Sequence, residues 1–176
     1  ISQFLWTVIA YNLLKPVSIV NYFMDTVDRK ILALLQEDAA LSIEKIAAKV
    51  HLSSTPCWKR IRRLENDGVI QKRVALLDAE KVGAGVTVFV AIKTNQHNRE
   101  WLDHFASSVE DMPEILDFYR MSGEIDYLLR VVVSDIAAFD DFYQRLISRV
   151  PLSDVTSSFA MEKIKHTTAL PIATTE

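Results

Sequence analysis

Apolar residues recur at helical spacing in three consecutive segments between residues 25 and 68. Within each segment they fall three or four positions apart, which places them on one face of an amphipathic helix. They are Val27, Ile31, Leu34 and Leu35 in the first segment, Ile43, Ile46, Ala47 and Val50 in the second, and Cys57, Ile61 and Leu64 in the third. The pattern predicts three short helices around a common core.

The third helix carries clear start and stop signals. Ser53 or Thr55 can supply the side-chain oxygen that caps its first amide groups, and Pro56 suits the first turn because it has no amide hydrogen. The helix stops at Asn66-Asp67-Gly68, where glycine adopts the left-handed conformation of many helix ends.

The second and third helices are separated only by the turn His51-Leu52-Ser53. Small Ala47 allows the two helices to approach closely, and Leu52 fills the corner between them. This arrangement predicts a helix-turn-helix. The turn position often held by glycine is His51, which tolerates a left-handed backbone better than β-branched residues do. Residues 69–74 alternate in polarity and predict a strand, which would form a wing beside the third helix.

A different pattern begins after Gly83 and Gly85. Alternating apolar residues predict strands over 86–92, 115–121, 127–133 and 155–164, and helical spacing predicts helices over 101–112 and 139–150. The order strand-helix-strand-strand-helix-strand is the ferredoxin-like (ACT-like) βαββαβ arrangement, with two helices on one face of an antiparallel sheet. The fold class is therefore α+β. The sheet has aliphatic residues on both faces, so we expect its open face to pack against a second copy.

Charge divides the chain in the same way as the hydrophobic pattern. Residues 24–75 hold ten basic and seven acidic residues, a net charge of +3, whereas residues 76–176 hold nine and sixteen, a net charge of −7. We therefore expect a DNA-binding domain over 24–75, a linker over 76–85, and a second domain over 86–176. The overall charge of −3 does not exclude a polyanion as the partner of the first domain.

The positive charge of the first domain is concentrated in its third helix. A basic helix alone is equally consistent with a solvated surface, but the second helix of a helix-turn-helix enters the major groove of DNA. Trp58 could pack on a sugar, intercalate, or complete the helix core. The candidate DNA contacts are Ser53, Ser54, Thr55, Trp58, Lys59, Arg60, Arg62 and Arg63, with Lys72 and Arg73 in the wing.

The first 23 residues are apolar and carry one charge, Lys15. Pro16 and two asparagines interrupt them, and they lack the basic start of a secretion signal, so a spanning helix is disfavoured. Because a well-formed helix follows Met24, we expect translation to start there and residues 1–23 to be an upstream or fusion-derived extension; a membrane-tethered regulator is the alternative. The single cysteine, Cys57, indicates a reducing cytoplasm and no disulfide within the chain.

Several segments together resemble the Lrp/AsnC (feast/famine) family of bacterial and archaeal regulators. They are Asp28-Arg29-Lys30-Ile31-Leu32, Leu52-Ser53-Ser54-Thr55-Pro56-Cys57, Arg62-Arg63-Leu64-Glu65-Asn66-Asp67-Gly68-Val69-Ile70 and Ser122-Gly123-Glu124-Ile125-Asp126-Tyr127-Leu128-Leu129. The resemblance covers Met24 to about Ile172. It implies a transcriptional regulator that binds double-stranded DNA, forms dimers that assemble into octamers, and binds a small amino acid at a subunit interface.

The resemblance places the effector at Met121, Ser122, Gly123, Asp126 and Tyr127. Gly123 would let the backbone approach a ligand and offer amide hydrogens to a carboxylate, and Asp126 could pair with an α-ammonium group. The alternative is an ordinary β-turn in which Asp126 accepts hydrogen bonds from backbone amides. The variant Pro56-Cys57-Trp58-Lys59-Arg60 resembles a branch associated with sulfur amino acids.

No catalytic or metal site is expected. His97, His104 and His166 lack the spacing of metal ligands, and no nucleophile has a base placed beside it. The rival reading is an enzyme, since haem-pathway decarboxylases share this two-domain architecture. Such an enzyme has less reason to keep the cationic third helix.

Overall fold

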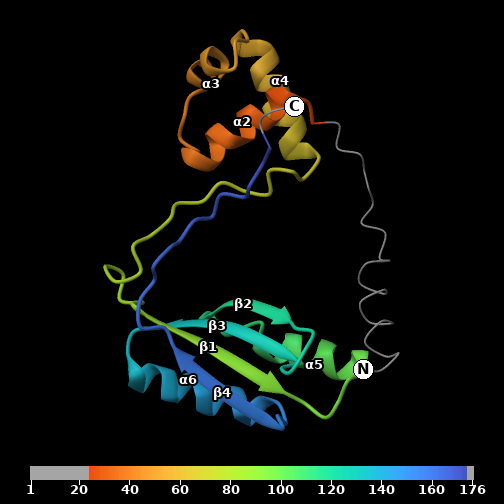
Figure 1. Ribbon diagram of the computed structural model, residues 1–176, viewed down its shortest axis with the longest axis vertical. Helices are drawn as coiled ribbons and strands as arrows, with labels where there is room; N and C mark the ends of the chain where they lie inside the picture. The colour runs from red at the N-terminus through yellow and green to blue at the C-terminus, as the bar shows by residue number, and fades with distance from the viewer. Residues whose placement is uncertain (1–23, 174–176) are drawn as a thin grey trace. The chain divides into compact units, whose positions relative to one another are not determined.

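The computed structural model describes residues 24–173, so the expected extension over residues 1–23 lies outside the described residues. The chain forms two compact units (Figure 1). One unit contains residues 24–74 together with residues 167–173, and the other contains residues 75–166. The last described residues therefore belong to the first unit, whereas the sequence led us to expect one domain over residues 86–176.

The first unit contains the three expected helices, α2 (Thr26–Glu37), α3 (Ile43–Lys49) and α4 (Ser54–Asn66). A capping box starts α2, because the carboxylates of Asp25 and Asp28 each accept a hydrogen bond from the other residue's amide. Ser42 caps α3 by accepting from the amide of Lys45. Ser53 occupies the N-cap of α4, but its hydroxyl makes no capping hydrogen bond.

The turn between α3 and α4 has the geometry expected of a helix-turn-helix. His51 adopts a left-handed backbone with φ of 57°, and the amide of Leu52 donates to the carbonyl of Ala47 at 2.9 Å. Gly68 ends α4 with φ of 73°. The buried residues of this unit are Ile31, Leu32, Ile46, Ala47, Val50, Cys57, Ile61 and Leu64. The predicted apolar faces of α3 and α4 are thus largely buried.

The strand expected over residues 69–74 does not form. The amide of Ile70 donates to the carbonyl of Leu64 at 3.0 Å, so the start of the segment folds back onto the end of α4. Val69 and Ile70 pack on the helical core, but residues 71–74 are exposed. A strand needs a hydrogen-bonded neighbour, and the described part of this unit offers none.

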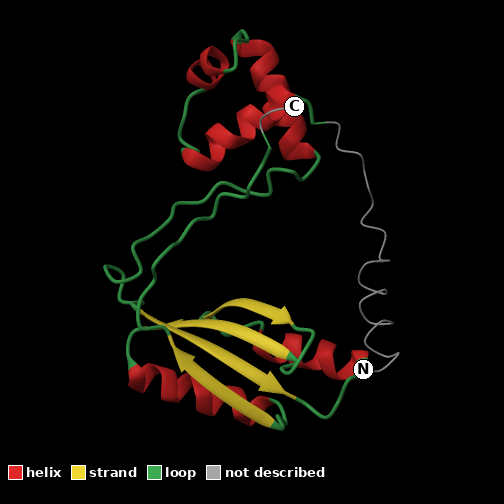
Figure 2. Ribbon diagram, in the orientation of Figure 1, coloured by secondary structure: helices red, strands yellow, loops and turns green. Residues whose placement is uncertain are grey.

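The second unit is a four-stranded antiparallel sheet with two helices on one side (Figure 2). Its elements are β1 (Val86–Lys93), α5 (Arg99–Val109), β2 (Ile115–Arg120), β3 (Tyr127–Val133), α6 (Ile136–Arg149) and β4 (Asp154–Phe159). The strand order β2-β3-β1-β4 confirms the βαββαβ arrangement. The last strand ends at Phe159, five residues before the expected end, and β2 and β3 agree with expectation to within one residue.

The two faces of the sheet differ in exposure. Val88, Val90 and Ile92 on β1 are buried against α5 and α6. The intervening side chains point to the other face, where Phe89 is 39% exposed and Tyr119 of β2 is 51% exposed. An ion pair between Arg130 of β3 and Asp117 of β2 crosses two neighbouring strands. The open face is thus apolar with a charged pair at a matched register position.

The C-terminal segment packs on the helical unit. The side-chain amide of Gln36 on α2 bonds both backbone groups of Leu170, accepting from its amide at 2.7 Å and donating to its carbonyl at 3.2 Å. Ile172 packs against the helical core, and Arg29 donates to the carbonyl of Ala173 at 3.5 Å.

None of the helices within residues 24–173 has the length and apolarity needed to cross a membrane.

Candidate nucleic-acid interface and ligand site

Helix α4 presents most of its polar residues to solvent. Cys57, Ile61 and Leu64 face the core, and burial raises the pKa of the Cys57 thiol, which fits an inert core residue. Ser53, Ser54 and Thr55 are exposed at the N-terminal end of the helix. This end of a recognition helix is the part that contacts base edges. The predicted base-reading residues are therefore accessible.

The basic residues of α4 fall into two groups. Arg60 donates to the carboxylates of Asp25 at 2.7 Å and Asp28 at 2.9 Å, and Arg63 donates to the other oxygen of Asp28. Hydrogen bonds with Asp28 and Asp25 raise the pKa of Arg60 above its ordinary value. These two arginines bind α4 to α2, a role that sequence reasoning missed because the aspartates lie more than thirty residues upstream.

Lys59, Arg62 and Trp58 form the outward group. Arg62 pairs with Glu65 at 3.0 Å, and its guanidinium lies 5.9 Å from the centre of the Trp58 ring. Trp58 is 49% exposed, so it does not complete the helix core. Among the described residues Lys59 makes no ion pair. These three side chains are exposed to solvent.

The two predicted wing cations are exposed in the segment after α4. Arg73 pairs with Glu65 at 3.0 Å, so Glu65 joins Arg62 and Arg73 through one carboxylate. Lys72 is exposed. The segment therefore places positive charge beside α4 although it forms no strand.

The predicted ligand loop connects β2 to β3. Gly123 has φ of 135° in a region that side chains rarely adopt, and nothing lies within 4 Å of where its Cβ would be. The amide of Met121 donates to the carbonyl of Asp126 at 2.8 Å and closes the loop. Met121, Ser122 and Glu124 are exposed. The loop is open to solvent, and its glycine is required by backbone geometry.

Asp126 is the polar centre of the loop. One carboxylate oxygen accepts a hydrogen bond from the buried Thr94 amide at 2.8 Å, and the other lies 3.6 Å from Nδ1 of His97. Lys93 pairs with Glu124 at 3.4 Å. One oxygen of Asp126 thus accepts from a backbone amide, as the alternative reading has it, but the donor follows β1 and does not belong to the turn. Sequence reasoning missed Thr94 and His97, which follow β1 and meet the loop only in the folded sheet.

Tyr127 differs from its neighbours because its side chain faces the core. It is 4% exposed and packs against Trp101, Phe105 and Phe118, with ring centroids 5.4 to 5.6 Å apart. Burial raises the pKa of its hydroxyl. Tyr127 therefore supports the loop from the core side. Among residues 24–173, the Trp101 indole nitrogen in the same cluster has no hydrogen-bond partner.

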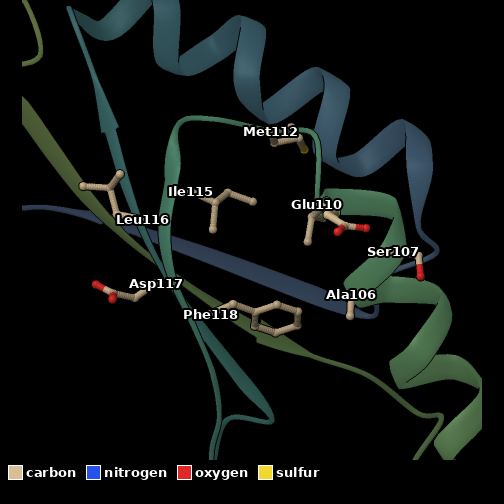
Figure 3. A pocket seen from close by; sticks show the side chains of 9 residues that line it. Ala106, Ser107, Glu110, Met112, Ile115, Leu116, Asp117 and Phe118 are labelled. Atoms are coloured by element: carbon tan, nitrogen blue, oxygen red, sulfur yellow. The ribbon is translucent and has the colours of Figure 1, made fainter. Parts of the chain in front are cut away.

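An open cavity of about 470 Å³ lies elsewhere in this unit, between the end of α5 and β2. Figure 3 shows Ala106 and Glu110 on the helical side and Ile115 and Phe118 on the strand side. None of the five predicted effector residues lines this cavity. Within residues 24–173 no cluster of metal-ligand side chains occurs.

Comparison with known proteins separates the same two domains at the linker. Residues 24–71 match a family described as winged helix-turn-helix DNA-binding, and residues 87–170 match one described as the Lrp/AsnC ligand binding domain. The chain is 58% identical over 150 residues to the DNA-binding transcriptional activator DecR of Escherichia coli (strain K12), covering 85% of this chain and 99% of DecR. It is 49% identical over 152 residues to the Glutamate uptake regulatory protein of Zymomonas mobilis, covering 86% and 93%.

Solved structures agree in fold over nearly their full length. An AsnC family transcriptional regulator from Agrobacterium tumefaciens superposes with a TM-score of 0.82 at 59% identity, covering 84% of this chain and 97% of that one. A transcriptional regulator from Neisseria meningitidis, in complex with L-Met, superposes with a TM-score of 0.79 at 37% identity, covering 84% and 96%. The enzyme alternative finds no support among these relatives. The chain therefore belongs to the Lrp/AsnC family of DNA-binding transcriptional regulators.

Proposed function

We propose that this regulator responds to a small amino acid bound at the β2–β3 loop, and that the bound amino acid changes its affinity for DNA. The observation that carries the proposal is the geometry of Asp126, which keeps one carboxylate oxygen directed toward His97 and outside the hydrogen bond to Thr94. That oxygen is available to an α-ammonium group. The glycine-containing loop beside it offers backbone amides to the α-carboxylate.

The proposed effector is a sulfur-containing amino acid. Two structural neighbours support this choice, the Neisseria meningitidis regulator and a Mycobacterium tuberculosis feast or famine regulatory protein, both in complex with L-methionine. The second neighbour is 27% identical to this chain. The exposed Met121 side chain, at the start of the loop, provides a polarizable contact for a thioether. No cofactor is needed for this role.

We further propose that the chain works as a dimer that assembles into an octamer. The apolar open face of the sheet, with Phe89 and Tyr119 exposed, is the surface that a second copy would cover. Replacing Phe89 with Lys should then give monomers in sedimentation experiments at micromolar concentration. An unchanged oligomer would move the interface to another surface.

On DNA, the proposed contacts comprise the N-terminal end of α4 for bases and the outward cations for phosphates. Among the predicted DNA contacts, the cations that are exposed and form no ion pair with Asp28 are Lys59, Arg62, Lys72 and Arg73. Binding to double-stranded DNA should depend steeply on salt, and each lost phosphate contact should reduce the log–log slope by about 0.9. Equal slopes for wild type and Lys59→Ala/Arg62→Ala would contradict this assignment.

Calorimetric titration with L-methionine, L-cysteine, L-leucine and L-glutamate, paired with DNA-binding assays, tests the effector proposal. We expect one of them to bind and to change DNA affinity by roughly 5–150-fold, the usual range of allosteric coupling. A ligand that binds equally well to both functional states would leave DNA affinity unchanged. Binding that survives replacement of both Gly123 and Asp126 would place the effector elsewhere.

A further inference from the structure

Asp28 is an unusual acidic residue because its side chain is almost fully buried, with 1% of its surface exposed. One carboxylate oxygen accepts from Arg60 at 2.9 Å, and the other accepts from Arg63 and, at 3.2 Å, from the amide of Asp25. Both arginines belong to α4, whereas Asp28 lies in the first turn of α2. The carboxylate therefore connects the two helices through two hydrogen bonds from α4, and a third hydrogen bond, from the Asp25 amide, fixes it at the start of α2.

This connection constrains α4 in two ways. A buried carboxylate without partners is costly, so any rotation of α4 that separated Arg60 and Arg63 from Asp28 would be opposed. The same contacts occupy two of the four basic side chains of α4. Lys59 and Arg62, which point outward, are left as the helix's cations for phosphates.

We propose that Asp28 is a positioning residue for DNA recognition. It fixes the rotational setting of α4, so that Ser54, Thr55 and Trp58 meet base edges, and it withholds Arg60 and Arg63 from sequence-independent contacts with phosphates. Phosphate contacts carry no sequence information directly, whereas base contacts do. Asp28 therefore raises the ratio of specific to non-specific affinity without touching DNA.

The first test replaces Asp28 with Asn in the full chain, which keeps the shape of the side chain and removes its charge. The probes are a duplex selected by the wild-type chain from a randomised 30-base-pair library and unselected duplexes of the same library. We expect non-specific binding to gain up to two phosphate contacts. The slope of log affinity against log salt concentration should then become steeper by as much as about 1.8. The ratio of selected to unselected affinity should fall tenfold or more. An unchanged ratio would overturn the proposal.

Glu65→Gln is the matched control. It also removes one negative charge beside arginines, but Glu65 is on α4 itself and its pairs with Arg62 and Arg73 do not reach α2. We expect it to raise non-specific affinity while the selected-to-unselected ratio stays within about threefold of wild type. A ratio that falls as far as in Asp28→Asn would show that net charge, and not the setting of α4, controls specificity, and would reject the positioning role.

Arg60→Gln provides a test that does not depend on the stability of the Asp28 variant, because Asp28 keeps its contact with Arg63. If Arg60 positions α4, its loss should lower the selected-to-unselected ratio and leave the salt slope for unselected duplexes unchanged. Lys59→Gln, by contrast, should reduce that slope by about 0.9. A similar reduction for Arg60→Gln would make Arg60 a phosphate contact and would contradict the proposal.

Discussion

Asp28 and Asp126 are both aspartates that connect two secondary-structure elements, but they differ in how many of their carboxylate oxygens accept hydrogen bonds within the chain. Asp28 is 1% exposed and all its contacts come from within the helical unit. Asp126 is 28% exposed, and only one of its oxygens accepts a hydrogen bond from the backbone. A fully satisfied buried carboxylate orients its neighbours, whereas a partly satisfied one beside an open loop can bind a ligand.

The largest expected effect comes from replacing Asp28 with Ala, which leaves two arginines beside an apolar core without their shared partner. Loss of one member of a buried ion pair typically costs about 3–5 kcal/mol, and we expect about 3 kcal/mol because both arginines keep partial contact with water. Hydrogen-exchange mass spectrometry should show faster exchange in α2 and α4, with β1 as the internal control. Equal hydrogen-exchange rates in α4 of the variant and the wild type would mean that Asp28 does not stabilise the packing of α4.

Asp126→Asn tests the other side of the comparison. Removing the charge should weaken binding of L-methionine by roughly tenfold to a hundredfold, because a hydrogen bond to a charged group contributes about 1.5–3 kcal/mol. Effector-free DNA binding should stay nearly as in wild type. Glu124→Gln, a charge-matched change on the same loop, should alter ligand affinity less than threefold because that side chain is 91% exposed. Calorimetry that finds Glu124→Gln the more damaging change would reverse the assignment.

Gly123→Ala should have a smaller effect on stability, about 1 kcal/mol, because alanine disfavours φ of 135° although space for its methyl group is open. The strained loop should also bind the effector several-fold more weakly. Thermal unfolding and calorimetric titration measure the two effects. Gly83→Ala is the control, since that glycine also has a positive φ, 73°, and open space but lies outside the loop. Loss of ligand affinity in Gly83→Ala alone would contradict the loop assignment.

The smallest effect concerns acid sensitivity at Asp25. Slight burial raises the pKa of this carboxyl, but hydrogen bonds from the Asp28 amide and the Arg60 guanidinium outweigh it and lower the pKa below 3.8. A lowered pKa means that the stabilisation is present above pH 3.8 and is lost as pH falls through the folded-state value. Asp25→Asn keeps a capping side chain but has no carboxyl to protonate, so its free energy of unfolding should not fall with pH in this way. For an exposed pair we expect variant and wild type to differ in this pH dependence by a few tenths of a kcal/mol. Urea unfolding at pH 5 and pH 3 measures it, and parallel curves would show that the pair contributes nothing.

Local patterns predicted the secondary structure well and the polar contacts poorly. The spacing of Cys57, Ile61 and Leu64 identified the buried face of α4, and His51 was correctly expected in the left-handed turn. The basic residues of α4 looked equivalent in sequence, because the partners of Arg60 and Arg63 lie on another helix. Thr94 was missed for the same reason, as its contact with Asp126 spans 32 residues.

The wing prediction shows a second limit of local reasoning. Alternation over residues 69–74 described a strand, but a strand also depends on a neighbour that the segment itself does not encode. The same holds at the end of the chain, where apolar Leu170 and Ile172 gave no periodic signal. Ile172 packs on the helical core, Leu170 bonds Gln36 through its backbone only, and no pattern within residues 160–173 indicates these contacts.

Because residues 167–173 dock on α2, the helical unit is formed by two segments that lie far apart in the sequence. After a proteolytic cut between residues 75 and 85, only the non-covalent contacts of residues 167–173 would connect the three helices to the rest of the chain. A fragment that ends at residue 75 would lack Ile172 and the hydrogen bonds between Leu170 and Gln36. A stop codon just before Leu170 would remove these contacts from the helical unit, although it would lie after the last strand of the sheet unit.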